Sequence, residues 1–248
     1  MTENWFDQGG EAYAKFRPEY PPELARALKA SIPHAKTVLD VGCGTGQLTT
    51  LLADEFENVI GVDPSQDQIA HAISKDNITF HTAPAEALGG QDHSFDLITV
   101  AQAAHWFQLD QFYGEVRRLA RPDALIALIS YGVLRFGNAT LDQSFMQFYK
   151  DDIGPFWPPE RVMVDTGYAT IHFPFDEIEA PKIEIKLNWD FDAFLGYIST
   201  WSATRRAREA GELNLLHDFA EKMYLAWGDR STRHEISWPI NIRMGWVR

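Results

Sequence analysis

A short apolar run at 37–41, TVLDV, is followed by three alternate glycines and then by a stretch with helical spacing that begins at Gln47. An apolar run of this length that ends in glycine is typical of a buried strand. The glycines are Gly42, Gly44 and Gly46, and a glycine backbone can take unusual angles and approach a ligand with no Cβ in the way. The sequence therefore predicts a strand–turn–helix unit whose turn binds a ligand, although a tight turn without a ligand fits the same residues.

Apolar runs and helical stretches continue to alternate as far as residue 131. The apolar runs predict strands at 37–42, 58–63, 77–82, 95–101 and 124–131. The helical spacing predicts helices at 47–56, 65–75 and 109–120. Because strands that alternate with helices form a parallel sheet joined by right-handed crossovers, the predicted fold class is α/β.

The chain beyond residue 131 follows a different pattern. Residues 132–180 hold several prolines and aromatic residues with little clear period, and we expect a largely helical insertion there. Strand-like stretches at 182–189 and 235–247 enclose helical ones, and we expect the two to form an antiparallel pair at an edge of the sheet. The expected organisation is one domain over 1–248, with an N-terminal lid (1–35), a ligand-binding core (36–131), the insertion (132–180), and C-terminal helices and edge strands (181–248).

The charge and composition limit the partners of the chain. Its formal net charge is −13, from 35 acidic and 22 basic residues, so a nucleic acid or an anionic membrane surface would be repelled. The single cysteine, Cys43, excludes an intrachain disulfide and a cysteine-rich metal site, and we expect no metal. No run approaches the roughly 18 apolar residues of a membrane helix, and the N-terminus lacks the pattern of a signal peptide. We expect a cytoplasmic protein, a monomer or a weak homodimer, that acts on a small molecule.

A carboxylate stands at the end of the second predicted strand. Asp63 follows Gly46 by 17 residues, and a carboxylate at such a position can accept hydrogen bonds from both ribose hydroxyls of a nucleotide. The same arrangement serves dinucleotide-binding enzymes, so these features alone leave a nicotinamide-dependent enzyme open.

Four segments together resemble the successive signatures of class I S-adenosylmethionine-dependent methyltransferases. They are VLDVGCGTGQ (38–47), VIGVDPS (59–65), APAEAL (83–88) and FDLITVAQAAHWF (95–107). The loop reads G-C-G-T-G and lacks the third glycine with which the G-x-G-x-x-G pattern of dinucleotide sites favours a diphosphate. The resemblance implies a Rossmann-like sheet, mostly parallel with an antiparallel edge strand, and a helical lid over its carboxyl end. It also implies S-adenosyl-L-methionine as cofactor and S-adenosyl-L-homocysteine as product.

The resemblance also implies roles for particular residues. Asp40 and the three glycines border the amino acid end of the cofactor, and Asp63 binds the ribose. The family often has Asp-Ala beside the adenine, whereas this chain has Pro84-Ala85, so Glu86 or a backbone carbonyl must accept the adenine amino group. The full set expected to bind the cofactor is Tyr13, Arg17, Asp40, Gly42, Gly44, Gly46, Gln47, Asp63, Pro64, Ala85, Glu86, Gln102 and Ala103.

Three further segments are similar to the trans-aconitate methyltransferase-like branch of the methyltransferase type 11 proteins. They lie at 6–24, 101–107 (AQAAHWF) and 197–206 (YISTWSATRR). The better understood members of that branch esterify small carboxylic acids, which makes a carboxylic acid the leading acceptor. The alternatives are N-, C- or phenol O-methylation of a small molecule, or a catalytically silent module that only binds the cofactor. Methylation of a protein or RNA is disfavoured by the acidity of the chain.

The residues before the core and those after the fourth strand are candidates for the acceptor side of the site. Tyr13 and Arg17 suggest a lid whose guanidinium pairs with the methionine carboxylate or the substrate, although a solvated helix fits as well. His105 and Trp106 follow the fourth strand, at the carboxyl end of the sheet where ligands bind in open α/β folds. His105 is expected to contact the substrate and to act as base where the acceptor carries a proton, and a purely structural histidine stays open.

The late helical segment holds a second catalytic and substrate-binding candidate. Trp201 and Arg205 are four residues apart, which predicts that they share one face of a helix as an aromatic wall and an anion clamp. A solvated helical face explains the same residues. Tyr131 is a weaker substrate-binding candidate, because it also fits a place in the core.

Overall fold

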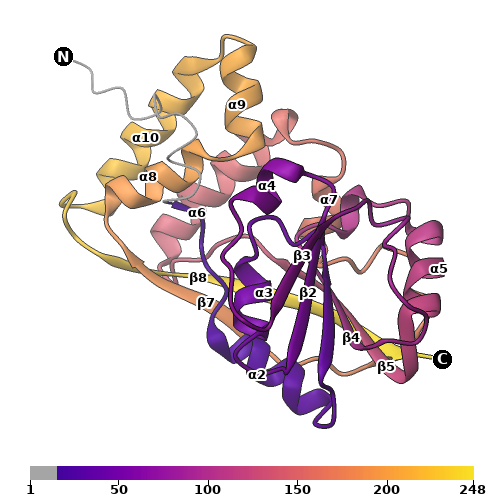
Figure 1. Ribbon diagram of the computed structural model, residues 1–248. Helices are drawn as coiled ribbons and strands as arrows, with labels where there is room; N and C mark the ends of the chain where they lie inside the picture. Colours follow the sequence, from indigo (N-terminus) through magenta and orange to yellow (C-terminus); the bar gives the residue numbers. More distant parts are fainter. Residues whose placement is uncertain (1–15) are drawn as a thin grey trace. The chain divides into compact units, whose positions relative to one another are not determined.

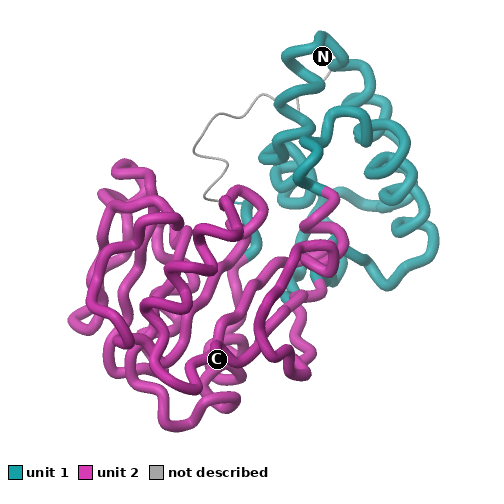
Figure 2. Tube along the Cα trace, turned by 90° about the vertical axis from the view of Figure 1, so that its right-hand side faces the viewer, with its two compact units in different colours: residues 1–18, 133–161, 185–238 teal, residues 19–132, 162–184, 239–248 magenta. Residues whose placement is uncertain are grey.

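The computed structural model describes residues 16–248, and the described chain packs into two compact units. Unit 1 comprises residues up to 18 together with 133–161 and 185–238, and unit 2 comprises 19–132, 162–184 and 239–248 (Figure 2). Residues 133–161 and 162–184 thus belong to different units, although the sequence groups them in one insertion. The expected division into a single domain with a lid and an insertion stays a prediction.

The central element is an eight-stranded sheet with the order β3-β2-β1-β4-β5-β8-β6, in which β7 also pairs with β8 (Figure 1). The strands are β1 (Thr37–Val41), β2 (Asn58–Asp63), β3 (Ile78–Thr82), β4 (Phe95–Ala101), β5 (Ala120–Tyr131), β6 (Asp176–Ile178), β7 (Ile183–Trp189) and β8 (His234–Val247). The first five pair in parallel, whereas β8 runs antiparallel to both β5 and β6. The predicted α/β fold, mostly parallel with an antiparallel edge, is confirmed.

The helices follow the predicted order but several are shorter. They are α2 (Pro22–Ser31), α3 (Gln47–Leu52), α4 (Gln66–Ala70), α5 (Leu109–Leu119), α6 (Ala139–Gln147), α7 (Arg161–Asp165), α8 (Phe191–Ser199), α9 (Ser202–Glu209) and α10 (Leu213–Trp227). Short turns of 3₁₀ or π-helix are η1 (Ala104–Trp106), η2 (Phe148–Asp152) and η3 (Gly154–Phe156). The predicted helix at 65–75 ends at Ala70, because α4 buries no side chain and so lacks the packing that stabilises a short helix.

The parallel strands of unit 2 are covered on both faces. Leu39, Ile98 and Ile126 lie in one apolar core with Phe112 and Val116 of α5. Helices α2 and α3 contact each other beside β1 and β2, and they bury Leu24, Leu28 and Leu52 (Figure 1). A parallel sheet buried on both faces explains why these strands read as continuous apolar runs in the sequence.

Unit 1 has a core made mainly of aromatic rings. Phe148 of the π-helical turn η2 stacks on Phe219 of α10 with ring centroids 3.6 Å apart, and Phe194 of α8 stacks on Trp227 at 5.3 Å. Each buried aromatic ring removes a large apolar area from water, which stabilises a unit built from short helices. The abundance of tryptophan and phenylalanine in the chain is therefore explained in large part by packing.

Candidate functional site

The strand order places a switch point between β1 and β4, which is where open α/β sheets bind ligands outside the carboxyl ends of their strands. The segments that leave these two strands touch there. A Cβ added at Gly42 would lie 2.5 Å from the Cβ of Ala103 and 3.2 Å from Cζ of Phe107. Glycine at this position therefore allows the loop after β1 to pack against the segment after β4.

The glycine loop has the backbone that the sequence predicts. Gly42, Gly44 and Gly46 have φ of +69°, +56° and +84°, a region that residues with a Cβ seldom adopt. The N–H groups of Gly42 and Cys43 both donate to the carbonyl oxygen of Val62, at 2.7 and 3.1 Å. Among residues 16–248, the nearest atom to a Cβ added at Gly44 is Gln68 Oε1, at 3.7 Å, so the described chain does not crowd the backbone of this glycine.

Asp63 is tied to the glycine loop. Its Oδ2 accepts a hydrogen bond from the Gly44 N–H and its Oδ1 one from the Ser65 N–H, both at 2.9 Å. A carboxylate has about four acceptor positions, so two further hydrogen bonds are available to ribose hydroxyls. The carboxylate thus orders the loop and still has acceptor positions for ribose hydroxyls.

Asp40 lies beneath the loop in the interior and is only 1% exposed. Its Oδ2 accepts from the Thr49 hydroxyl of α3 at 2.6 Å and its Oδ1 from the Thr99 hydroxyl of β4 at 2.8 Å. Burial raises the pKa of Asp40 to about 6, against the opposing effect of the two hydroxyl donors. In the structure this carboxylate joins α3 to β4, and the role beside the amino acid end of the cofactor that the resemblance implies for it stays a prediction.

The segments after β3 and β4 provide the other cofactor candidates. Oε1 of Glu86 accepts from the Gln108 N–H at 2.7 Å, at the start of α5, while Ala85 is buried beside it. Gln102 has φ of +54° although it is not glycine, and its N–H donates to the Ile129 carbonyl oxygen at 2.9 Å. Such strained residues occur often at ligand sites.

His105 lies in the 3₁₀ turn η1, directly after the switch point, and contacts a residue that the sequence reasoning missed. Its Nδ1 is 3.0 Å from the hydroxyl oxygen of Tyr168, and the two rings stack with centroids 6.0 Å apart. Trp106 is 64% exposed, so it is not a core residue. Tyr168 follows Gly167 in a stretch without clear period, and 63 residues separate it from His105, so no local pattern indicates the pair.

Tyr131 at the end of β5 packs into the interior of unit 2. It is 7% exposed, and its ring meets that of Tyr20 edge-on, with centroids 6.2 Å apart. This placement fits the core alternative for Tyr131.

In unit 1, the prediction that Trp201 and Arg205 share one face of a helix is wrong. Trp201 is 5% exposed and lies among aromatic rings, including Trp157 at 5.1 Å. Arg205 is on the surface, with 72% of its side chain exposed and Glu209 at 3.9 Å. Trp201 is the N-cap residue of α9, and its carbonyl oxygen accepts from the Arg205 N–H at 3.1 Å, but its own backbone is extended, with φ −73° and ψ 144°. Its side chain therefore does not follow the helical direction that the four-residue spacing assumes.

The lid candidates are placed only in part. One guanidinium nitrogen of Arg17 donates to the Thr200 carbonyl oxygen at 3.4 Å, within unit 1. Tyr13 lies outside the described residues.

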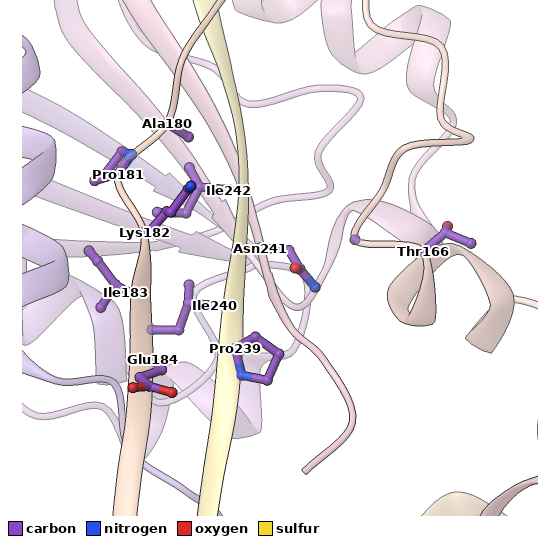
Figure 3. Close-up of a pocket in the computed structure, with 11 residues that line it drawn as sticks. Thr166, Ala180, Pro181, Lys182, Ile183, Glu184, Pro239, Ile240, Asn241 and Ile242 are labelled. Atoms are coloured by element: carbon purple, nitrogen blue, oxygen red, sulfur yellow. The ribbon is translucent and has the colours of Figure 1, made fainter. Parts of the chain in front are cut away.

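Unit 2 also contains a hollow of about 570 Å³ beside β8 (Figure 3). It is lined by residues of three segments, among them Thr166, Lys182, Glu184, Asn241 and Ile242. The described residues that line it include none from the glycine loop or from the segment after β4.

Residues 16–248 contain no group of three or more His, Cys, Asp or Glu side chains that could hold a metal ion. No helix in this part of the chain has the length and apolar character needed to cross a bilayer.

Comparison with known proteins gives matches over both the core and the whole chain. The family described as "Methyltransferase domain" matches residues 39–128. A Dictyostelium discoideum protein named as a methyltransferase is 34% identical over 242 residues, which cover 95% of this chain and 92% of that protein. A Saccharomyces cerevisiae protein, named as a probable S-adenosylmethionine-dependent methyltransferase, is 33% identical over 48% of this chain and 44% of its own length. A solved structure from Anaeromyxobacter dehalogenans, named as a type II methyltransferase, has a TM-score of 0.87 and 43% identity, and covers 94% of this chain and 98% of that one.

Proposed function

We propose, given that this chain belongs to the methyltransferase family, that it methylates the oxygen of a small carboxylic acid. The chain is an S-adenosylmethionine-dependent methyltransferase, and the proposal concerns the molecule that accepts the methyl group. The observation that carries the proposal is the meeting of two segments at the switch point, where the glycine loop, hydrogen-bonded to Asp63, packs against the segment after β4 that holds His105.

The residues at the switch point fit S-adenosyl-L-methionine. The described chain does not crowd the backbone at Gly44, and Asp63 keeps acceptor positions for the ribose. Glu86 retains a second carboxylate oxygen for the adenine amino group. When bound, the cofactor supplies an electrophilic methyl group. The residues proposed to hold it are Gly42, Gly44, Gly46, Gln47, Asp63, Pro64, Ala85, Glu86, Gln102 and Ala103, with Asp40 supporting the loop from beneath.

The acceptor class is supported by charge and by chemistry. A carboxylic acid is ionised at neutral pH, so it reacts without a base, and the protein needs only to align its oxygen with the methyl carbon. The formal net charge of −13 opposes a polyanionic acceptor such as RNA. His105 and the exposed Trp106 are proposed to contact the acceptor.

A second candidate is methylation of a phenol, an amine or a carbon acid. Such an acceptor must lose a proton, and His105 at the carboxyl end of β4 is the group that would act as the base. The hydrogen bond between His105 and Tyr168 supports this second candidate, because a base must be held in one orientation. The monomeric or weakly dimeric state and the cytoplasmic location stay predictions.

The test is incubation of the full chain with methyl-labelled S-adenosyl-L-methionine and a panel of small carboxylic acids, phenols and amines, followed by mass identification of labelled products. The proposal expects label in a carboxylic ester that alkali hydrolyses. Label in an ether or an amine supports the second candidate instead. Cofactor binding without turnover on any acceptor, including those in a cell extract, supports a silent binding module.

A further inference from the structure

We propose that helix α5 determines how selectively the protein binds adenine, because Glu115 and Arg118 on this helix hold the segment that carries Glu86. That segment, the adenine loop, comprises residues 83–90 after β3. Glu115 and Arg118 are then positioning residues, since they act on the cofactor only through Glu86. The inference rests on the proposed function, which places Glu86 beside the adenine amino group.

The adenine loop contains two consecutive glycines. Gly89 and Gly90 have φ of +68° and +83°, in the left-handed region that other residues seldom adopt. Because consecutive glycines give a backbone many alternative conformations, the loop needs contacts from outside itself to stay in one of them. One such contact lies at its start, where the Ala83 N–H donates to the Asp63 carbonyl oxygen at 3.2 Å. The others come from α5.

Glu115 of α5 binds the loop and Arg118 at the same time. Its Oε2 accepts a hydrogen bond from the Leu88 N–H at 2.9 Å. Its Oε1 and Oε2 also accept from Nε and Nη2 of Arg118, at 2.8 and 2.7 Å. Two parallel hydrogen bonds of this kind fix the orientation of a carboxylate. Arg118, together with the Leu88 N–H, outweighs partial burial and holds the pKa of Glu115 below its ordinary 4.5.

Arg118 extends the contact to the two glycines. Its Nη2 donates to the Gly89 carbonyl oxygen at 2.9 Å and its Nη1 to the Gly90 carbonyl oxygen at 3.1 Å. Nη1 also donates to Asp92 at 2.8 Å, but the Asp92 side chain is 64% exposed, so water screens that pair. A planar guanidinium that binds Glu115 and two carbonyl groups cannot rotate without losing several hydrogen bonds. Glu115 and Arg118 therefore act as one clamp on the backbone of the loop.

The same helix also binds the side chain of Glu86. The N–H of Gln108, the residue directly before α5, donates to Glu86 Oε1 at 2.7 Å. A carboxylate has about four acceptor positions, so this bond leaves capacity for an amino group of the ligand. Glu86 is two residues before Leu88, so a shift of Leu88 moves the backbone that carries Glu86. The helix thus fixes Glu86 both at its carboxylate and through the loop.

The consequence is selectivity for adenine. Adenine carries an amino group at C6, which donates hydrogen bonds, whereas hypoxanthine carries a carbonyl oxygen there, which accepts them. A carboxylate held in place accepts from the first and opposes the lone pairs of the second. A site built around one hydrogen bond rejects an analogue that cannot form it, provided that the group in the site cannot turn away. Release of the clamp lets Glu86 turn to water and removes this selectivity.

The test compares 5′-methylthioadenosine with 5′-methylthioinosine by calorimetric titration of the full chain. We expect the parent to bind the adenine compound at least about tenfold more tightly, the effect of one hydrogen bond to a charged group. Glu115→Ala should weaken the adenine compound by about tenfold and the inosine compound by less than about twofold, because the latter never had that bond. A merely structural role would weaken both compounds equally. Equal losses, or an unchanged preference, overturn the proposal.

Two further variants separate the clamp from charge and from general stability. Arg118→Lys keeps the positive charge, but its single ammonium group cannot reach Glu115 and both glycine carbonyls at once, so it should lose the preference as Glu115→Ala does. A preference equal to that of the parent in Arg118→Lys overturns the clamp. Glu177→Ala is the matched control, because Glu177 also forms a two-point ion pair, with Arg243 at 3.0 and 3.1 Å, but lies on β6. It should leave both affinities unchanged.

Hydrogen exchange of the Leu88 amide measures the clamp without any ligand. Glu115→Ala and Arg118→Lys should both speed this exchange, because Leu88 loses a fixed acceptor. The amide of Ile98, buried in β4, is the internal control and should exchange as in the parent. Unchanged exchange at Leu88 in Glu115→Ala overturns the proposal.

The proposed function is tested separately by Glu86→Ala, which removes the acceptor itself. If Glu86→Ala keeps the parent's preference for adenine, or if the parent has none, the contact between Glu86 and adenine is wrong. That contact belongs to the proposed function, and the methyltransferase activity does not depend on it. If Glu86→Ala loses the preference while Glu115→Ala keeps it, only the role of the clamp is overturned.

Discussion

Replacement of Asp40 by asparagine should make the protein less sensitive to pH. The carboxyl is 1% exposed, and burial raises its pKa from an ordinary 3.8 to about 6, although Thr49 and Thr99 donate hydrogen bonds to it. The shift is about two units, and one unit corresponds to 1.36 kcal/mol, so ionising Asp40 in the folded state costs on the order of 3 kcal/mol. The asparagine side chain would keep the shape without the charge: its amide oxygen can accept from one of the two threonine hydroxyls, and its NH2 group can donate to the oxygen of the other.

The sign follows from proton binding in the two states. Between an unfolded pKa of 3.8 and a folded pKa of about 6, the folded state binds the proton more tightly than the unfolded state. Rising pH therefore lowers the free energy of unfolding of the parent through this window. Relative to Asp40→Asn, the parent should lose on the order of 3 kcal/mol between about pH 4 and about pH 7.

The measurement is urea unfolding of the cofactor-free parent and variant over this pH range. Asp96→Asn is the matched control with the opposite sign. Burial opposes ionisation of Asp96, but hydrogen bonds from the Lys36 N–H, Arg121 and the Thr37 N–H outweigh it and hold its pKa below the ordinary 3.8. The parent should therefore be more stable than Asp96→Asn at neutral pH and lose that advantage in acid. The account of Asp40 is refuted if the difference in free energy of unfolding between the parent and Asp40→Asn does not change with pH. It is also refuted if this difference shifts in favour of the parent as pH rises.

Three further predictions concern the residues at the switch point. S-adenosyl-L-homocysteine should bind one site per chain and stabilise the folded state by about 2.7 kcal/mol at a hundredfold excess over Kd, and calorimetry without heat or thermal shift would exclude this site. Asp63→Ala should weaken the cofactor by about ten- to a hundredfold, because a charged acceptor is lost, and unchanged affinity in a titration would show that the ribose contact is wrong. Gly42→Ala should destabilise the fold by about 1–3 kcal/mol in urea unfolding, because φ is +69° at this position and the added Cβ would lie 2.5 Å from the Cβ of Ala103. Gly89→Ala is its control, because φ is +68° there but no atom of the described residues lies within 4 Å of the added Cβ, and equal effects of the two would contradict the packing argument.

Much of the proposed cofactor site could be predicted from the sequence, because the patterns that indicate its strands, glycines and helices are local. The three loop glycines have the positive φ expected of them, and strands β1 to β5 lie close to the predicted ranges. Asp63 meets the loop as well, since the ends of neighbouring parallel strands share one edge of a sheet. The resemblance to known methyltransferases is confirmed by a relative and a solved structure that span nearly the whole chain.

The acceptor side depends on contacts between residues far apart in the chain, and no local period records those. Spacing alone predicts one face for Trp201 and Arg205, yet the helix begins after Trp201 and packing buries only the tryptophan. Tyr168 reaches His105 across 63 residues, because Arg243 on an antiparallel strand holds its loop in place. The sequence by itself determined the strand, the glycine loop and the helix of the proposed cofactor site, since each part needs only its neighbours. Only the tertiary structure decided which side chains meet at the end of β4, because burial and long-range hydrogen bonds select them.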